Sequence, residues 1–404
     1  MENRKKARFS SALTAGLFAM GVLVVPLAHA DQVTLQVEHY YTAGPQVQAF
    51  ATAIGDCAAT YGAKINITVV PGDALDAKVL QQSSSKTLPD LLMLDNPDVA
   101  SFASTGALLP LSQFGITATG FYPGIVAAST YKGKLYSLQP ITNTISLFYN
   151  TDLLKAAGLT PPTTWSSLKR DAKRLTHGNN YGLAFSAKAD FEGTWQFLPF
   201  MWTAGASEDN INSPQMASAI QLWVDLFNAK SVSHSALTWS QSDVNDQFIA
   251  GKAAMMINGP WQYPALKAVP SLHWAVAPIP TPAAGGVSVS PLGGEGWTLP
   301  DTGNAANEAI AAKVLVCLNS DSNQMKIGLA GGVIPTKIKL AKAYVKQAPD
   351  MAAFVKQVAT ARARTGIVGE NWPAAATKIF KAFQLALVGG KTAAQAASIA
   401  AAGQ

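Results

Sequence analysis

Large aromatic rings stand beside short amides, carboxylates or glycines at several points of this 404-residue sequence. A sugar presents flat C–H faces edged by hydroxyl groups, so its binding site needs aromatic rings for the faces and polar side chains for the hydroxyls. Each tryptophan taken singly is more often a packed core residue. Because the rings recur beside turn-forming and polar residues, the set predicts a carbohydrate site. Its aromatic members are Tyr40, Tyr41, Trp195, Trp202, Trp261, Trp297 and Trp372.

The segment FIAGKAAMMINGPWQYP at 248–264 shows this pattern most clearly. Its apolar run is typical of a buried strand and ends at Asn258. Gly259 and Pro260 then predict a turn that brings Trp261 beside the amide. Loops at strand ends tolerate exposed rings and amides. We therefore expect Asn258 to bind hydroxyls and Trp261 to stack on a sugar, in a crevice between two lobes.

Catalytic signatures are missing from the sequence, which has no G-x-S-x-G, H-E-x-x-H, C-x-x-C or G-x-x-x-x-G-K-[ST] segment. An exported sugar hydrolase would need two carboxylates facing a cleft, and Asp95, Asp98 and Glu295 keep that alternative open. Aspartates beside Asn96 and Pro97 more often form turns and caps. Neither a metal nor a cofactor is expected, because the histidines lack metal-ligand spacing: His39, His177, His234 and His273.

Short apolar runs alternate with longer amphipathic segments, which is typical of an α/β protein. Helices are predicted after the capping residues Thr164 and Ser213, and from about Pro373 to the glycines at 389–390. Ser167 replaces the glutamate of a capping box, so we expect that box to be lost. The segments around Trp195 and Glu295 are expected to be loops. The predicted strands cover 33–37, 65–70, 91–94, 146–149, 253–257 and 274–277.

Residues 1–30 have the pattern of an export signal. Four basic residues precede an apolar run that ends in A-H-A, a typical cleavage site after Ala30. A membrane anchor is the less favoured alternative, since Gly16, Gly21 and Pro26 interrupt the run. No cysteine follows it for lipid attachment. We therefore expect cleavage and a soluble protein in the periplasm.

The charge of the chain is modest once this segment is set aside. Residues 1–30 hold four of the 30 Lys and Arg residues and one of the 24 Asp and Glu residues, so the remainder carries a formal net charge of +3. No basic cluster with interleaved aromatic residues remains, and nucleic acid is not an expected partner. The remaining chain, roughly 370 residues, exceeds what one core comfortably serves, so two lobes are expected.

Cys57 and Cys317 are the two cysteines of the sequence. Each lies in an apolar segment with a helical pattern. An oxidising compartment would allow them to form a disulfide, whereas two separate buried thiols are the favoured alternative.

Four segments together resemble the bacterial extracellular solute-binding proteins of carbohydrate ABC importers, the group of the maltose-binding protein. They are DLLMLDNPDVASFASTGALLPLS (90–112), YKGKLYSLQPITNTISLFYNTDLLKAAGLTPPTTWSSL (131–168), FIAGKAAMMINGPW (248–261) and GGVIPTK (331–337). The resemblance implies the two-lobed type II periplasmic binding protein fold, a hinge that closes on ligand, and delivery of a sugar to a membrane permease. It places ligand contacts at Tyr40, Tyr41, Asp95, Asn96, Asn143, Asn258 and Trp261.

Local reasoning adds five further candidates to this ligand site: Trp195, Glu295, Trp297, Arg364 and Trp372. We expect lobe 1 to comprise 31–140 with 285–327, and lobe 2 to comprise 141–284 with 328–404. Chain crossings are expected near 139–144, 278–294 and 328–335. The expected protein is a monomeric, non-enzymatic receptor for a mono- or oligosaccharide or a polyol. A polyamine receptor is a further alternative, for which only Asp95 and Glu295 offer carboxylates.

Overall fold

The computed structural model describes residues 32–41 and 45–403 of the chain. The predicted export signal over 1–30, with its cleavage after Ala30, lies outside these residues. Every helix in the described ranges falls short of the length and apolar character that a bilayer crossing requires.

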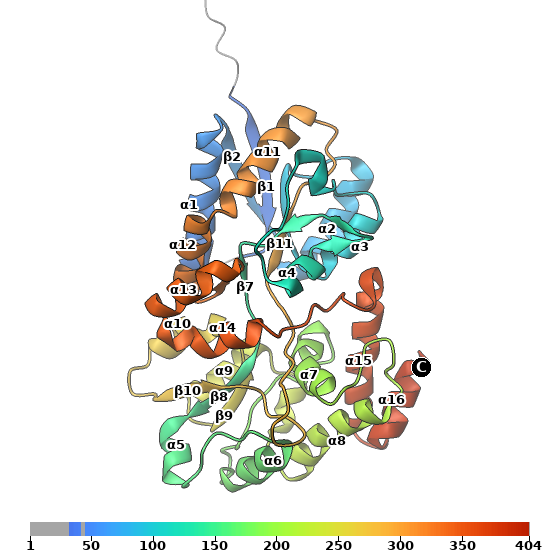
Figure 1. The fold of residues 1–404 in the computed structure, drawn as a ribbon. Helices are drawn as coiled ribbons and strands as arrows, with labels where there is room; N and C mark the ends of the chain where they lie inside the picture. The colour runs from blue at the N-terminus through green and yellow to red at the C-terminus, as the bar shows by residue number, and fades with distance from the viewer. Residues whose placement is uncertain (1–31, 42–44, 404) are drawn as a thin grey trace, which may run out of the picture. The chain divides into compact units, whose positions relative to one another are not determined.

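Helices and short strands alternate along the described residues (Figure 1). The strands are β1 (Thr34–His39), β2 (Lys64–Val69), β3 (Leu91–Asp95), β4 (Thr130–Tyr131), β5 (Lys134–Leu135), β6 (Ser137–Leu138), β7 (Ile141–Thr142), β8 (Ser146–Asn150), β9 (Met255–Asn258), β10 (Trp274–Ala277), β11 (Glu295–Thr298) and β12 (Ile334–Pro335). The helices are α1 (Pro45–Thr60), α2 (Gly72–Ser85), α3 (Asp98–Ser104), α4 (Pro123–Ala128), α5 (Thr151–Ala156), α6 (Trp165–Arg174), α7 (Phe191–Thr203), α8 (Pro214–Asn228), α9 (Gln241–Ile249), α10 (Tyr263–Lys267), α11 (Ala305–Leu318), α12 (Asp321–Gly331), α13 (Ala341–Gln347), α14 (Ala352–Val358), α15 (Trp372–Leu387) and α16 (Ala393–Ala401).

The first sheet has five strands in the order β2-β1-β3-β11-β6. β1 pairs in parallel with β2 and β3, whereas β11 runs antiparallel to β3. Successive side chains of a strand point to opposite faces, and β3 buries both. Leu91 and Met93 join the core formed with α1 and α11, while Leu92 and Leu94 join the core formed with α2 and α3. Helices therefore cover both faces of this sheet (Figure 1).

The second sheet consists of β8 between its antiparallel neighbours β10 and β9. Its central strand is also buried on both faces. Leu147 belongs to the core built with α6, α7, α8 and α15, whereas Phe148 packs in the other direction against Tyr263 and Phe354. The predicted ligand contacts in these two sheets lie at the carboxyl ends of β3 and β9 and at the amino end of β11.

Two of the predicted crossing passages lie side by side. β7, from the first passage, pairs with β12, from the third, through Thr142 opposite Ile334 and Ile141 opposite Pro335. The hydroxyl of Thr336 also donates to the carbonyl of Gln139 at 2.5 Å. The two passages are therefore held together by strand pairing and by a side-chain hydrogen bond. The predicted lobe boundaries stay a prediction.

All six predicted strands are present, with ends that differ from the prediction by at most two residues. The predicted helices are confirmed as α6, α8 and α15. The predicted loss of a capping box is wrong. The Ser167 hydroxyl accepts the Thr164 backbone N–H at 3.0 Å, and the Thr164 hydroxyl accepts the Ser167 N–H at 3.2 Å. Serine therefore fills the position usually taken by glutamate.

Two segments that were expected to be loops are regular elements. Trp195 and Trp202 lie within α7, whose residues 193–202 are all buried. A helix buried on every side shows no amphipathic pattern, so its sequence did not predict it. Glu295 begins β11, an unpredicted strand that lies in the interior of the first sheet. Its four residues include one glycine and were too few to show alternation.

Cys57 of α1 and Cys317 of α11 form a disulfide. The sequence left two separate thiols as the favoured alternative, and that preference is wrong. Both helices pack on the same face of the first sheet, which brings the two cysteines together with Cα atoms 5.8 Å apart. The bond joins residues 260 positions apart in the sequence.

Candidate ligand-binding site

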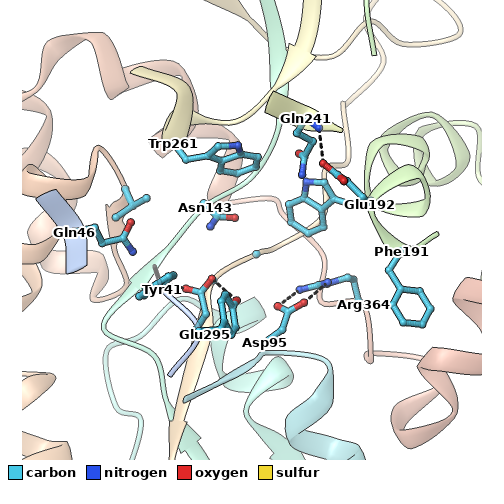
Figure 2. Close-up of a pocket in the computed structure, with 15 residues that line it drawn as sticks. Tyr41, Gln46, Asp95, Asn143, Phe191, Glu192, Gln241, Trp261, Glu295 and Arg364 are labelled. Atoms are coloured by element: carbon cyan, nitrogen blue, oxygen red, sulfur yellow. Dashed lines mark hydrogen bonds and ion pairs between the residues drawn. The ribbon is translucent and has the colours of Figure 1, made fainter. Parts of the chain in front are cut away.

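A cavity of about 340 Å³ lies among the strand ends and loops of the two sheets. Figure 2 shows Trp261 on the side opposite Tyr41 and Glu295, with Asn143 between them. Eight of the twelve predicted ligand residues line this cavity: Tyr40, Tyr41, Asp95, Asn143, Trp195, Trp261, Glu295 and Arg364. Residues more than 300 positions apart in the sequence thus line one cavity.

Glu295 is the central acceptor on the side formed by the first sheet. Its backbone lies directly opposite Asp95 in the β3–β11 ladder. The Tyr40 hydroxyl donates to Glu295 Oε1 at 2.8 Å, and the Tyr41 hydroxyl donates to Oε2. Burial raises the pKa of Glu295 to about 7, although the hydrogen bond from Tyr41 favours the ionised form. The carboxyl group is therefore held in place and able to accept or donate near neutral pH.

This buried carboxyl predicts a pH-dependent stability. The pKa of Glu295 is about 7 in the folded protein and 4.5 as a free side chain. Its contribution to stability is fully present below pH 4.5 and is lost as the pH rises through 7. Replacing Glu295 with glutamine removes the titration. We expect the wild-type free energy of unfolding, relative to that of Glu295→Gln, to fall by about 3 kcal/mol between pH 4.5 and pH 8. Urea unfolding of both proteins at several pH values measures this, and a constant difference would contradict it.

Arg364 lines the cavity beside Asp95 of β3 and Trp195 of α7. Its Nη1 donates to Asp95 Oδ2 at 2.8 Å and its Nη2 donates to Asp95 Oδ1 at 2.5 Å. The guanidinium also lies over the ring of Trp195, 4.8 Å from its centroid. An arginine that is paired and stacked in this way is fixed in orientation. The cation of the cavity is therefore engaged by protein groups on two sides.

Trp261 presents its ring to the cavity from the turn after β9. The ring folds back over the backbone at Gly259, where an added Cβ atom would lie 2.0 Å from the indole carbon Cζ3. Glycine is needed at this position because of that close approach. The φ of −114° and ψ of 172° at Gly259 are extended values that any residue adopts.

Gly259→Ala is expected to displace the Trp261 ring without straining the backbone. The added methyl group occupies the space of the ring, so the ring must turn away from the cavity. We expect ligand affinity to fall toward the level of Trp261→Ala, as measured by calorimetric titration. The double variant should bind no more weakly than Trp261→Ala alone. An additional loss in the double variant would mean that Gly259 acts otherwise.

The start of α7 brings a further carboxylate to the cavity. Asp190 caps this helix, with Oδ1 accepting the backbone N–H of Glu192 at 2.9 Å and that of Gly193 at 3.1 Å. Glu192 therefore lies in the first turn, and its Oε1 accepts the backbone N–H of Gln241 at the start of α9. Figure 2 shows this contact on the Trp261 side of the cavity. The starts of α7 and α9 are therefore joined by a hydrogen bond at the edge of the cavity.

Asn143 and Trp195 meet at Gly293 along the middle of the cavity. A Cβ atom at Gly293 would lie 1.9 Å from Asn143 Oδ1 and 2.7 Å from Trp195 Cη2. The backbone N–H of Gly293 donates to the Asn143 carbonyl at 2.9 Å. The glycine allows the two side chains to close on the backbone of the second crossing passage. This joins the amide and one ring into a single surface.

Four predicted residues lie outside the cavity lining. Asn96 and Asn258 are buried, and each binds backbone groups of the protein instead. Trp297 is fully buried against Phe50 in the first sheet. Trp372 begins α15 and packs in the core of the second sheet. Trp202 is likewise buried, and its indole N–H donates to Glu208 at 2.9 Å.

Asn258 nevertheless supports the cavity indirectly. Its side-chain amide donates to the carbonyl of Gln241 at 2.9 Å, and Gln241 lines the cavity. The predicted amide at the strand end is therefore present, but it orients a neighbouring helix start. Its Oδ1 accepts the backbone N–H of Gly259 at 3.0 Å, which fixes the turn before Trp261.

The sequence did not predict several lining residues: Gln46, Phe191, Glu192, Gln241, Gly293, Gly294 and Val333. Gln46 follows Tyr41 by five positions at the start of α1, and Gln241 follows the N-cap residue Ser240. Polar residues in the first turn of a helix are a usable signal, because helix starts often face ligands in α/β folds. This signal is weak, because polar residues are also common in the first turn of helices that bind no ligand.

The lining combines aromatic faces with hydrogen-bonding groups and provides no metal centre. Within the described ranges, no group of three or more His, Cys, Asp or Glu residues could hold a metal ion. Rings from Trp195, Trp261 and Tyr41 can contact apolar faces of a ligand, while Glu192, Glu295 and the amides can accept or donate hydrogen bonds. This arrangement can bind a hydroxyl-rich molecule.

Comparison with known families identifies the chain's relatives. The family described as "bacterial extracellular solute-binding protein" matches residues 47–353. A maltodextrin-binding protein of Bacillus subtilis (strain 168) is 24% identical over 73% of this chain and 72% of its own length.

Solved structures of sugar-binding proteins share the fold. A cyclic α-maltosyl-1,6-maltose binding protein from Arthrobacter globiformis has a TM-score of 0.78 and 26% identity, over 92% of this chain and 97% of its own. The maltose-bound MalE3 protein of T. maritima has a TM-score of 0.80 and 24% identity, over 92% of this chain and 98% of its own. The predicted two-lobed α/β fold is thereby confirmed.

Proposed function

The chain belongs to the bacterial extracellular solute-binding protein family, and from this premise we propose that it is the sugar receptor of an ABC importer. It binds a mono- or oligosaccharide, or a polyol, between its two lobes and delivers it to the membrane permease. The protein acts in the periplasm as a monomer, without catalysis and without a nucleic acid partner. Residues 31–140 with 285–327 form one lobe, and 141–284 with 328–404 form the other.

The observation that carries this proposal is the composition of the cavity. Trp261 and Trp195 come from the second sheet and its helices, while Tyr41 and Glu295 come from the first sheet. Rings and acceptors therefore lie on both sides of one space (Figure 2). Relatives that bind maltodextrin or a cyclic maltosyl-maltose support a carbohydrate as the ligand.

Closure follows from differential affinity. A sugar that contacts both sides at once gains free energy in the closed arrangement that it lacks in the open one, so binding shifts the population toward closure. The paired β7 and β12 strands and the neighbouring crossing passages supply the hinge. The permease then meets a loaded, closed receptor.

A thermal-shift screen tests the proposal directly. Mono-, di- and trisaccharides, polyols and polyamines are added to the mature protein at concentrations up to 1 mM. A ligand bound only by the folded state raises the melting temperature, with about 2.7 kcal/mol of stabilisation at one hundred times the dissociation constant. We expect one or more sugars or polyols to shift the melting temperature and polyamines to leave it unchanged.

Recovery of the ligand distinguishes the receptor from an exported hydrolase. After long incubation and release by denaturation, the sugar is expected to return chemically intact, as judged by chromatography and mass spectrometry. A cleaved product would favour the hydrolase. A shift produced by polyamines alone would remove sugars as the ligand class.

A further inference from the structure

The contacts of Arg364 have the form that proteins use to bind a ligand carboxylate. Two parallel N–H groups of a guanidinium grip the two oxygens of a carboxylate. Here both positions are taken by Asp95, at 2.8 and 2.5 Å. Nη2 also donates to Asn96 Oδ1 at 3.2 Å, and the guanidinium plane lies over Trp195. A carboxylate of the protein thus occupies the place that an acidic ligand would take.

The other acidic or basic side chains that line the cavity carry carboxyl groups. Of the described lining residues, Asp95, Glu192 and Glu295 are acidic and Arg364 is basic. Glu192 and Glu295 make no ion pair of their own in the described ranges. Lys188 lies near Glu192, but it pairs with Asp190 at 2.8 Å and does not line the cavity. With Arg364 neutralised, the cavity offers an acidic ligand no free cation.

The chain contains a second arginine that pairs with a carboxylate and lies over a tryptophan ring, outside the cavity. Arg362, two positions earlier, donates from Nη2 to Glu208 Oε2 at 2.8 Å and lies 4.8 Å from the ring centroid of Trp202. Neither Arg362 nor Glu208 lines the cavity. This pair has one hydrogen bond where Arg364 and Asp95 have two, and it gives a related control whose access to ligand differs.

Resting on the proposed function, we propose that Asp95 is the specificity-determining residue that excludes acidic sugars from the cavity. Its carboxylate acts as an internal anion on Arg364, so the site accepts uncharged sugars and rejects uronates of the same ring. A carboxylate on the ligand would have to displace Asp95 and leave it unpaired beside Glu295. Loss of the Asp95 charge would free Arg364 to receive the ligand carboxylate.

Matched sugar pairs test this in the wild-type protein. Glucose and glucuronate, galactose and galacturonate, and the oligosaccharides that the thermal screen identifies with their uronate-bearing counterparts are compared by calorimetric titration. Wherever the neutral member binds, we expect the acidic member to bind at least tenfold more weakly. Equal or tighter binding of the acidic member would overturn the inference and leave the receptor function standing. Failure of every sugar to bind would instead contradict the function itself.

Variants assign the selectivity to Asp95. In Asp95→Asn the ratio of neutral to acidic affinity is expected to fall at least tenfold, through a gain for the acidic sugar. Asp95→Asn combined with Arg364→Gln should lose that gain, because the freed cation is removed. Glu208→Gln, which frees Arg362 outside the cavity, should keep the wild-type ratio. Circular dichroism checks the fold of each variant, and the wild-type comparison decides the question should Asp95→Asn not fold. An unchanged ratio in folded Asp95→Asn would overturn the assignment.

Discussion

Trp261→Ala is expected to raise the dissociation constant of the sugar at least tenfold. The indole ring is held over Gly259 and faces the cavity, so its removal takes away a flat surface that a sugar face can cover. Micromolar binding corresponds to about −8 kcal/mol, and a tenfold loss corresponds to about 1.4 kcal/mol. Calorimetric titration of the mature protein with the sugar from the thermal screen measures the change.

Trp274→Ala serves as the matched control for this substitution. Trp274 is also partly buried, and it packs against Tyr263 with ring centroids 4.7 Å apart, but it does not line the cavity. We expect it to lower the melting temperature and leave the dissociation constant within twofold of wild type. If Trp261→Ala binds the sugar as tightly as wild type does, the ring has no place in the site.

Removal of the disulfide is expected to lower the free energy of unfolding by about 3–5 kcal/mol. The bond closes a loop of 260 residues between α1 and α11, so the unfolded chain gains much conformational freedom when it is absent. The double variant Cys57→Ser with Cys317→Ser avoids a leftover thiol. Guanidinium unfolding of the double variant and of the oxidised wild-type protein gives the difference.

Ligand affinity provides the internal control for the disulfide. Neither cysteine lines the cavity, so the folded double variant should bind sugar with the wild-type dissociation constant. Wild-type protein unfolded under reducing conditions should match the double variant. Coincident unfolding curves for the variant and the oxidised protein would show that the bond contributes nothing to stability.

Apolar runs and capping residues in the sequence predicted six of the strands and three of the helices in the described residues. Short apolar runs between longer amphipathic segments predicted β1, β2, β3, β8, β9 and β10. The caps Thr164 and Ser213 predicted where α6 and α8 begin. These signals are local, because a strand or a cap depends on a few neighbouring residues. The sequence did not predict β11, because it is short, or α7, because it is buried on all sides. The stability of both elements comes from contacts with distant segments.

The site residues likewise divide into those that local sequence signals predicted and those that only distant contacts determine. The sequence by itself determined that rings or polar groups stand at the ends of β1, β3 and β9, and Tyr40, Tyr41, Asp95 and Trp261 do line the cavity. It could not separate Trp261 from Trp297, since both stand beside glycine and a polar residue. The β3–β11 pairing turns Trp297 into the core and leaves Glu295 at the strand end.

Only the tertiary structure decided which charges meet. Asp95 and Arg364 are 269 positions apart, and nothing near either residue in the sequence indicates the other. Glu192 and Gln241 likewise join only when the starts of α7 and α9 come together. A helix or strand reflects neighbouring residues, whereas an ion pair or a cavity wall depends on how distant elements pack. Four of the seven predicted rings line the cavity, whereas the pairing of Asp95 with Arg364 could not be predicted from the sequence.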